Sequence, residues 1–350
     1  MGGHGRRGHG RELAALLWAL VLGGCSSHSS SGGNDTSTDA GPEDASDDAA
    51  PVPPTCTATF DEGECSIGPT YTQAPELTVA AGVPRGMVTH FTMDAANSKI
   101  YPGTFTRDVW VYIPMQYVDG TEIALMVVQD GNQFMTQITA ALDTLIAAKS
   151  LPQMVGIFVG TTQDSERSVE YDTVSDAYTR FVESEVLPLV PANPDIQATY
   201  KNLDVTTNPD GRASFGGSSG GAAAFTMGWF HPELYHRIVT YSGSFVDLQP
   251  TAAYPHGAWV DPEHLVAGSP AEPLRVTLEV GSGDLNLDTI SGDDMHGWVD
   301  ANEGMATALK AQGYHYRFVY GIGAGHEDPG VIGQTLPDTL RWVWKGYQIP

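Results

Sequence analysis

Basic residues are scarce in this sequence: Lys and Arg together number 17 of 350, against 42 Asp and Glu, and the formal net charge is −25. A nucleic-acid-binding protein needs Lys and Arg to displace the counterions of the phosphate backbone. The deficit argues against a nucleic-acid partner and disfavours strongly anionic ligands unless arginines cluster locally to receive them. Arg107, Arg167 and Arg180 are candidates for such a cluster, although ordinary surface charges are the alternative interpretation.

Motifs for metals, cofactors and membrane spans are also missing. The eleven histidines include no H-E-x-x-H and no paired metal spacing, and no G-x-x-x-x-G-K-[ST] nucleotide loop occurs. We therefore expect neither a metal nor a cofactor. No apolar stretch after the N-terminal region is long enough to span a membrane, and no internal repeat is visible.

The N-terminal region has the pattern of an export signal. Three arginines precede an apolar run, Leu13–Leu22, which is too short for a mature membrane anchor. Residues 1–24 are therefore predicted to be a signal peptide. It ends in Leu22-Gly-Gly-Cys25, which resembles the lipobox of bacterial lipoproteins and implies lipidation of Cys25; a plain secretory signal is the alternative. Ser26, rather than Asp, after the cysteine suggests an outer-membrane location.

Residues 25–55 are expected to form a disordered acidic tether, because they contain six acidic residues, no Lys or Arg and almost nothing to bury. Removing residues 1–24, which carry three Arg and one Glu, takes the formal net charge from −25 to about −27. Apart from Cys25, the chain has only Cys56 and Cys65, and in an exported protein these are expected to form a disulfide. Residues 56–350 suit one large α/β domain.

The folded part alternates strand and helix patterns, and its apolar runs are continuous, as in strands that are covered on both faces. This alternation predicts a mostly parallel sheet with helices on both faces and reactive loops at the carboxyl ends of the strands. We expect strands at Met87–Met93, Phe105–Pro114, Ile123–Gln129, Met154–Val159, Arg212–Phe215, Ile238–Tyr241, Val276–Val280 and Tyr316–Tyr320. We expect helices at Gln137–Lys149 and Ser175–Val190, from the glycine–serine turn through Trp229, and at Trp298–Gln312 and Leu336–Tyr347. A polar loop is expected at Thr161–Thr173.

The most informative motif follows the strand at Arg212–Phe215. The segment Gly216-Gly-Ser-Ser-Gly-Gly221 leads directly into an alanine-rich helix, which is the layout of a nucleophile elbow, where a serine sits on a strained turn. The pattern G-x-S-x-G fits either Ser218 or Ser219, and a flexible turn is the alternative interpretation.

A nucleophilic serine needs a histidine base and an acid that orients it, and in α/β-hydrolases these follow in the order Ser, Asp or Glu, His. Asp284 and His326 each follow a predicted strand within a few residues. The oxyanion formed in the reaction needs two backbone N–H donors. We expect one from Ser219, if Ser218 attacks, and the other from around Gly131 and Asn132.

The chain resembles the enterochelin-esterase-like (esterase D) family of α/β-hydrolases over about 71–347. The family's G-x-S-x-G-G pattern, followed about fourteen residues later by Pro-Glu, fits only Ser218, and the resemblance implies Asp284 and His326 as its partners. The acid is the least specific match, because Asp288, Asp293 and Asp294 are near it in sequence. The matching motifs are Tyr101-Pro-Gly-Thr, Val128-Gln-Asp-Gly, Glu170-Tyr-Asp, Arg212 to Phe225, His231-Pro-Glu-Leu-Tyr, Ser242-Gly-Ser-Phe and Gly325-His.

This resemblance implies a serine carboxylic ester hydrolase that works through an acyl-enzyme, and the lipobox-like end of the signal peptide implies that it is exported and lipid-anchored. Its relatives act on catecholate siderophore lactones, feruloyl or acetyl esters of polysaccharides and small acyl esters. The scarcity of cations favours a neutral or carbohydrate-borne ester over a siderophore. Acyl transfer is the second enzymatic hypothesis, and an inactive surface-binding lipoprotein is the non-enzymatic one.

Overall fold

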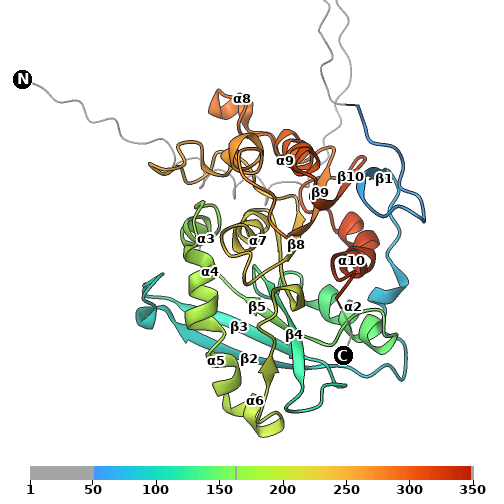
Figure 1. Cartoon of the computed structure of the whole chain (residues 1–350), viewed down its shortest axis with the longest axis vertical. Helices are drawn as coiled ribbons and strands as arrows, with labels where there is room; N and C mark the ends of the chain where they lie inside the picture. Colours follow the sequence, from blue (N-terminus) through green and yellow to red (C-terminus); the bar gives the residue numbers. More distant parts are fainter. Residues whose placement is uncertain (1–50, 162–163, 348–350) are drawn as a thin grey trace, which may run out of the picture.

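The computed structural model describes residues 51–161 and 164–347 (Figure 1). The predicted signal peptide, Cys25 and most of the predicted tether lie outside the described residues. Among the described residues, no helix is long and apolar enough to cross a membrane.

One sheet of ten strands runs through the molecule in the order β1-β10-β9-β8-β7-β4-β5-β3-β2, with the short β6 paired to β4 (Figure 1). β3 pairs antiparallel with β2 and β5, and the other pairings are parallel. The mostly parallel α/β architecture predicted from the sequence is therefore confirmed. The strands are β1 (Gly63–Ile67), β2 (Met87–Asp94), β3 (Thr106–Ile113), β4 (Glu122–Val128), β5 (Met154–Val159), β6 (Asp204–Val205), β7 (Arg212–Gly217), β8 (Arg237–Tyr241), β9 (Arg275–Gly281) and β10 (His315–Gly321).

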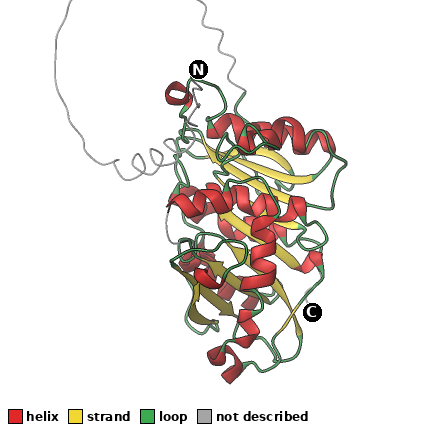
Figure 2. Ribbon diagram, turned by 90° about the vertical axis from the view of Figure 1, so that its left-hand side faces the viewer, coloured by secondary structure: helices red, strands yellow, loops and turns green. Residues whose placement is uncertain are grey.

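Helices cover both faces of the sheet (Figure 2). Side chains of β4 alternate between the two layers: Met126 packs in the cluster that contains residues of α2 and α10, and Leu125 in the cluster that contains residues of α4 and α7. A third cluster joins α7 and α9 to β8, β9 and β10. The α-helices are α2 (Met135–Ala147), α3 (Asp164–Tyr171), α4 (Ala177–Phe181), α5 (Leu189–Ala192), α6 (Pro194–Thr199), α7 (Ser219–Phe230), α8 (Asp288–Ser291), α9 (Trp298–Gln312) and α10 (Pro329–Val343).

Three sequence-based boundaries were wrong. The predicted loop at Thr161–Thr173 contains helix α3, whose one large aliphatic residue, Val169, is exposed, so hydrophobic periodicity gave no signal. The predicted helix Ser175–Val190 is interrupted by a π-helical turn at Val182–Val186. Helix α10 begins at Pro329 rather than Leu336, because the Asp328 side chain caps its first turn.

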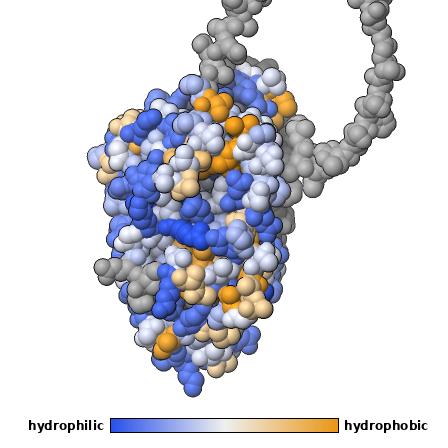
Figure 3. Space-filling model, turned by 90° about the vertical axis from the view of Figure 1, so that its right-hand side faces the viewer, coloured by the Kyte–Doolittle hydropathy of each residue, from blue (hydrophilic) through white to orange (hydrophobic). Residues whose placement is uncertain are grey.

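The N-terminal edge of the sheet carries the predicted disulfide, because Cys56 and Cys65 are bonded and Cys65 lies in β1 beside β10. Elsewhere on the surface, hydrophobic residues appear in small groups among hydrophilic ones on the face drawn in Figure 3. The exposed large hydrophobic residues in the described ranges are spread along the chain: Val52, Val88, Met115, Val118, Val169, Leu189 and Ile290.

Candidate active site

Ser218 stands at the turn where β7 ends and α7 begins. Its φ of 54° and ψ of −129° place it in a backbone conformation that costs a non-glycine residue energy and persists where the surroundings enforce it. A Cβ on Gly216 would lie 2.0 Å from the carbonyl oxygen of Gly220, and a Cβ on Gly220 would lie 2.6 Å from an oxygen of Asp130. The glycines on both sides of the serine are therefore required by close packing, as a nucleophile elbow demands.

Three predicted residues form one line of hydrogen bonds. The Ser218 hydroxyl lies 2.8 Å from Nε2 of His326, and Nδ1 of His326 lies 2.6 Å from Oδ1 of Asp284. The Asp284 side chain is fully buried, so its carboxylate is well placed to hold Nδ1–H as a donor. Nε2 is then free to accept the serine proton, which is the arrangement needed for a general base.

The loops after β9 and β10 bring the acid and the histidine together. The amide of Gly283 donates to the carbonyl of Ala324 at 2.8 Å, which joins the Asp284 loop to the His326 loop through their backbones. A Cβ on Gly281 would lie 2.5 Å from the same carbonyl oxygen. Glycine therefore permits the close approach that places Asp284 beside His326.

The structure separates Asp284 from the acids that compete with it in the sequence. Asp293 bonds to the ring of His296 at 2.8 Å, and Asp288 accepts the His296 backbone amide at 2.6 Å. Asp294 is exposed. Asp284 is the one of these four carboxylates that hydrogen-bonds to His326.

Ser219, the other candidate nucleophile, faces a different way. It is 6% exposed, and within the described residues no hydrogen bond joins its hydroxyl to His326, whereas the Ser218 hydroxyl makes one. The structure thus brings Ser218, and not Ser219, to the histidine.

Two residues at the site were not assigned a role from the sequence. The Ser244 hydroxyl lies 3.4 Å from that of Ser218 and accepts the indole N–H of Trp298 at 3.1 Å. Trp298 is fully buried, and its ring meets that of His326 edge to face at 5.8 Å. The motif Ser242-Gly-Ser-Phe contains Ser244, but the sequence gave no reason to place it beside the nucleophile.

The loop after β4 is only partly as predicted for an oxyanion hole. Gly131 has a φ of +57°, and its amide donates to the carbonyl of Val159 at 2.9 Å, so Gly131 is not the free donor that was expected. A Cβ on Gly131 would lie 2.9 Å from Cα of Gly160; the glycine is needed for packing against β5 rather than for opening the site. In the described part of the chain, the amides of Asn132 and Ser219 have no protein acceptor, which leaves them as the candidate donors.

The charges around the site are mainly negative. The guanidinium of Arg167 binds the Asp130 carboxylate through two hydrogen bonds, at 2.6 and 2.9 Å. On the other side of the elbow, Glu327 follows the histidine and accepts from Gln133 at 3.0 Å; burial raises the pKa of the Glu327 carboxyl. The remaining candidate cations are also paired: Arg107 is buried against Glu170, and Arg180 pairs with Asp176.

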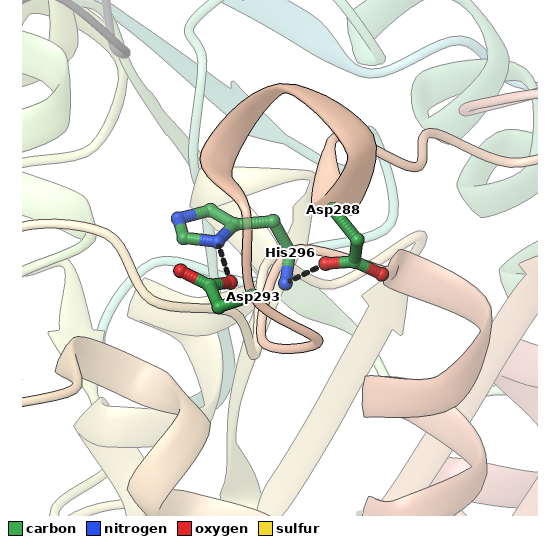
Figure 4. A group of neighbouring side chains, drawn as sticks. All are labelled: Asp288, Asp293 and His296. Carbon is green, nitrogen blue, oxygen red and sulfur yellow. Dashed lines mark hydrogen bonds and ion pairs between the residues drawn. The ribbon is translucent and has the colours of Figure 1, made fainter.

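One group of side chains within the described ranges has the composition of a cation site (Figure 4). Asp288, Asp293 and His296 bring candidate ligand atoms within 4.8 Å of one another. The hydrogen bonds inside the group hold the loop between Asp284 and α9 in shape. Since these bonds account for the arrangement, we assign the group no catalytic role.

An elbow serine, a histidine and a buried aspartate on successive loops at the carboxyl edge of a parallel sheet define an α/β-hydrolase with an ester-hydrolase type of site. The family model described as "Putative esterase" matches residues 105–342, and the chain belongs to this family of carboxylic ester hydrolases.

A curated relative is the iron(III) enterobactin esterase of Dickeya dadantii (strain 3937), 28% identical over 250 residues, which are 69% of this chain and 52% of that protein. The chain therefore spans about half the length of this relative. Among solved structures, the enterobactin esterase of Shigella flexneri in the presence of 2,3-dihydroxy-N-benzoyl-serine is 22% identical, with a TM-score of 0.56, covering 78% of this chain and 63% of the other. A feruloyl esterase module from Clostridium thermocellum complexed with sinapinate is 14% identical, with a TM-score of 0.53, covering 83% and 98%. Both structures share the fold.

Proposed function

We propose that this protein hydrolyses carboxylic esters through an acyl-enzyme formed on Ser218. The observation that carries the proposal is the unbroken line of hydrogen bonds from Ser218 through His326 to the buried Asp284. Its location at the elbow of an esterase-family chain supports the same conclusion.

The chemistry follows from this geometry. His326 Nε2 takes the hydroxyl proton as Ser218 Oγ adds to the ester carbonyl, and the amides of Ser219 and Asn132 receive the oxyanion. Collapse of the tetrahedral intermediate expels the alcohol, which takes the proton from His326 and leaves the acyl group on Ser218. Water then adds to the acyl-enzyme with His326 again as base, and the carboxylic acid is released.

A neutral or carbohydrate-borne ester, such as an acetyl or feruloyl ester, is the proposed substrate class. Asp130 and Glu327 lie beside the elbow, and the three candidate arginines Arg107, Arg167 and Arg180 are each bound to a carboxylate. An anionic substrate would therefore meet these two carboxylates with none of the three arginines free to offset its charge.

An enterobactin-type siderophore lactone is the second candidate, because the curated relative named above is an iron(III) enterobactin esterase. Its catecholate groups make this substrate strongly anionic. The two candidates separate in a competition assay: feruloyl and acetyl esters are expected to be cleaved at higher kcat/KM than the siderophore lactone, and the opposite order would favour the second candidate.

The proposed location is the outer membrane, through a lipid on Cys25 and a tether that holds the domain away from the bilayer. The support is the sequence alone, in which the apolar run ends in Leu22-Gly-Gly-Cys25. Cys25→Ser is expected to move the protein from the membrane fraction to the soluble fraction, whereas a variant that stays with the membrane would contradict lipidation.

Hydrolysis of p-nitrophenyl acetate and butyrate by the wild type and by Ser218→Ala tests the proposed function. We expect Ser218→Ala to lose about 10⁴-fold or more in kcat, because the triad acts as a unit. Ser219→Ala serves as the matched control and should keep at least about a tenth of the activity, since its amide remains. Loss of activity in Ser219→Ala alone, with Ser218→Ala unaffected, would mean that Ser219, and not Ser218, is the nucleophile.

A further inference from the structure

Helix α3 holds the loop after β4, which carries one half of the candidate oxyanion hole. α3 is mostly polar, and side-chain hydrogen bonds from Arg167 and Tyr171 join it to that loop. These bonds account for a segment that the hydrophobic pattern of the sequence left as a loop.

The first half of the hole is the loop after β4, and two residues of α3 hold it. Arg167 binds both oxygens of the Asp130 carboxylate. The Tyr171 hydroxyl accepts the Asp130 amide at 3.1 Å and donates to the Val159 carbonyl at 3.4 Å. Since Val159 also accepts the Gly131 amide, the conformation of this loop is fixed up to Asn132, whose amide is left free.

The residue after α3 is a buried carboxylate. Asp172 is 1% exposed and accepts the Ser168 hydroxyl at 2.7 Å. Ser168 in turn accepts Gln249 Nε2 at 3.0 Å. A buried carboxylate is costly unless polar partners surround it, so these bonds hold the end of α3 to the loop that contains Gln249.

We propose that Tyr171 is a positioning residue for the oxyanion hole, because it holds the loop that carries the Asn132 amide. This inference rests on the proposed esterase function. It assigns a role to the tyrosine of the motif Glu170-Tyr-Asp: the last side chain of α3 sets the position of the Asn132 donor relative to the Ser219 donor at the elbow. The spacing matters because donors stabilise the oxyanion when they are aimed at the position that it will occupy.

The experiment measures kcat and KM for p-nitrophenyl acetate with Tyr171→Phe, together with its melting temperature. The change should lower kcat about tenfold and alter KM less than twofold, because a displaced donor weakens the transition state more than substrate binding. Thr173→Ala is the matched control: its hydroxyl donates to the Val169 carbonyl in α3, away from the loop after β4, and it should retain the wild-type kcat.

Wild-type kcat in Tyr171→Phe, or a rise of KM without loss of kcat, would overturn the assignment. Should Tyr171→Phe fail to fold, Arg167→Gln tests the same loop through its two bonds to Asp130 and should lower kcat severalfold at unchanged KM. Ser218→Ala in the same assay keeps the two proposals distinct: activity in that variant refutes the proposed function, whereas an inactive Ser218→Ala beside a fully active Tyr171→Phe refutes only the positioning role.

Discussion

The catalytic triad and the oxyanion hole are neighbours that are built in different ways. Each triad residue lies within five residues of the end of a strand, and close glycine contacts fix its loop. The oxyanion loop instead depends on side chains of α3, a short polar helix that reaches across from another part of the chain. The comparison teaches that backbone packing positions the reacting side chains, whereas a buried polar network positions the backbone amide that stabilises the oxyanion.

The largest effect that this comparison predicts is in the triad. His326→Ala and Asp284→Asn should each lower kcat by about 10⁴-fold. The first removes the base, and the second no longer holds His326 in the tautomer that carries its proton on Nδ1. Asp293→Asn is the control, because Asp293 bonds to His296 instead. If Asp293→Asn were as damaging as Asp284→Asn in steady-state ester hydrolysis, the acid would be misassigned.

The triad could be predicted from the sequence because its signal is local: a glycine–serine turn after a strand, then Asp284 and His326 after later strands. The oxyanion loop could not be predicted in full. Gly131 looked like a donor, and only the fold shows that its amide is used by Val159. Helix α3 was missed because its buried contacts are polar and carry no hydrophobic period.

A smaller but still large effect is expected on stability at the elbow. Gly216→Ala would place a Cβ 2.0 Å from a backbone oxygen, so the elbow must shift, and we expect a loss of about 3 kcal/mol in the free energy of unfolding. Gly333→Ala, inside α10, is the opposite control. Its Cβ would have a single ordinary contact at 3.9 Å, and helix propensity predicts a gain of about 0.5–1 kcal/mol. Urea unfolding of both variants tests whether backbone packing, rather than glycine flexibility, defines the elbow.

The carboxylates Asp284 and Glu279 are both buried, but within the described part of the chain only the first has a partner for its charge. Asp284 is buried with His326 as its partner, whereas Glu279, on β9 five residues earlier, is 3% exposed and neither of its oxygens has a partner among the described residues. Burial, with Asp284, Asp328 and Glu327 nearby, raises the pKa of Glu279 well above its usual value. Above the pKa of the unfolded chain, the folded state therefore binds more protons than the unfolded one, and stability falls as pH rises.

The smallest predicted effect is on the melting temperature, and it follows from this fall of stability with rising pH. Glu279→Gln, which stays neutral, should melt about 2–4 °C higher than the wild type at pH 8, equivalent to roughly 1 kcal/mol in a domain of this size, with a smaller difference at pH 5. Glu122→Gln, an exposed position at the start of β4, should show no such pH dependence. A gain that is equal at both pH values would mean that Glu279 is not held in its protonated form.

The central claim is that Ser218 is the nucleophile, and covalent labelling tests it most directly. The protein is treated with a fluorophosphonate, and the adduct is located by intact mass and peptide mapping in the wild type, Ser218→Ala and Ser219→Ala. The account predicts one adduct per chain, on Ser218, that is absent in Ser218→Ala and present in Ser219→Ala. An adduct on Ser219, or ester hydrolysis that continues in Ser218→Ala without any adduct, would contradict it.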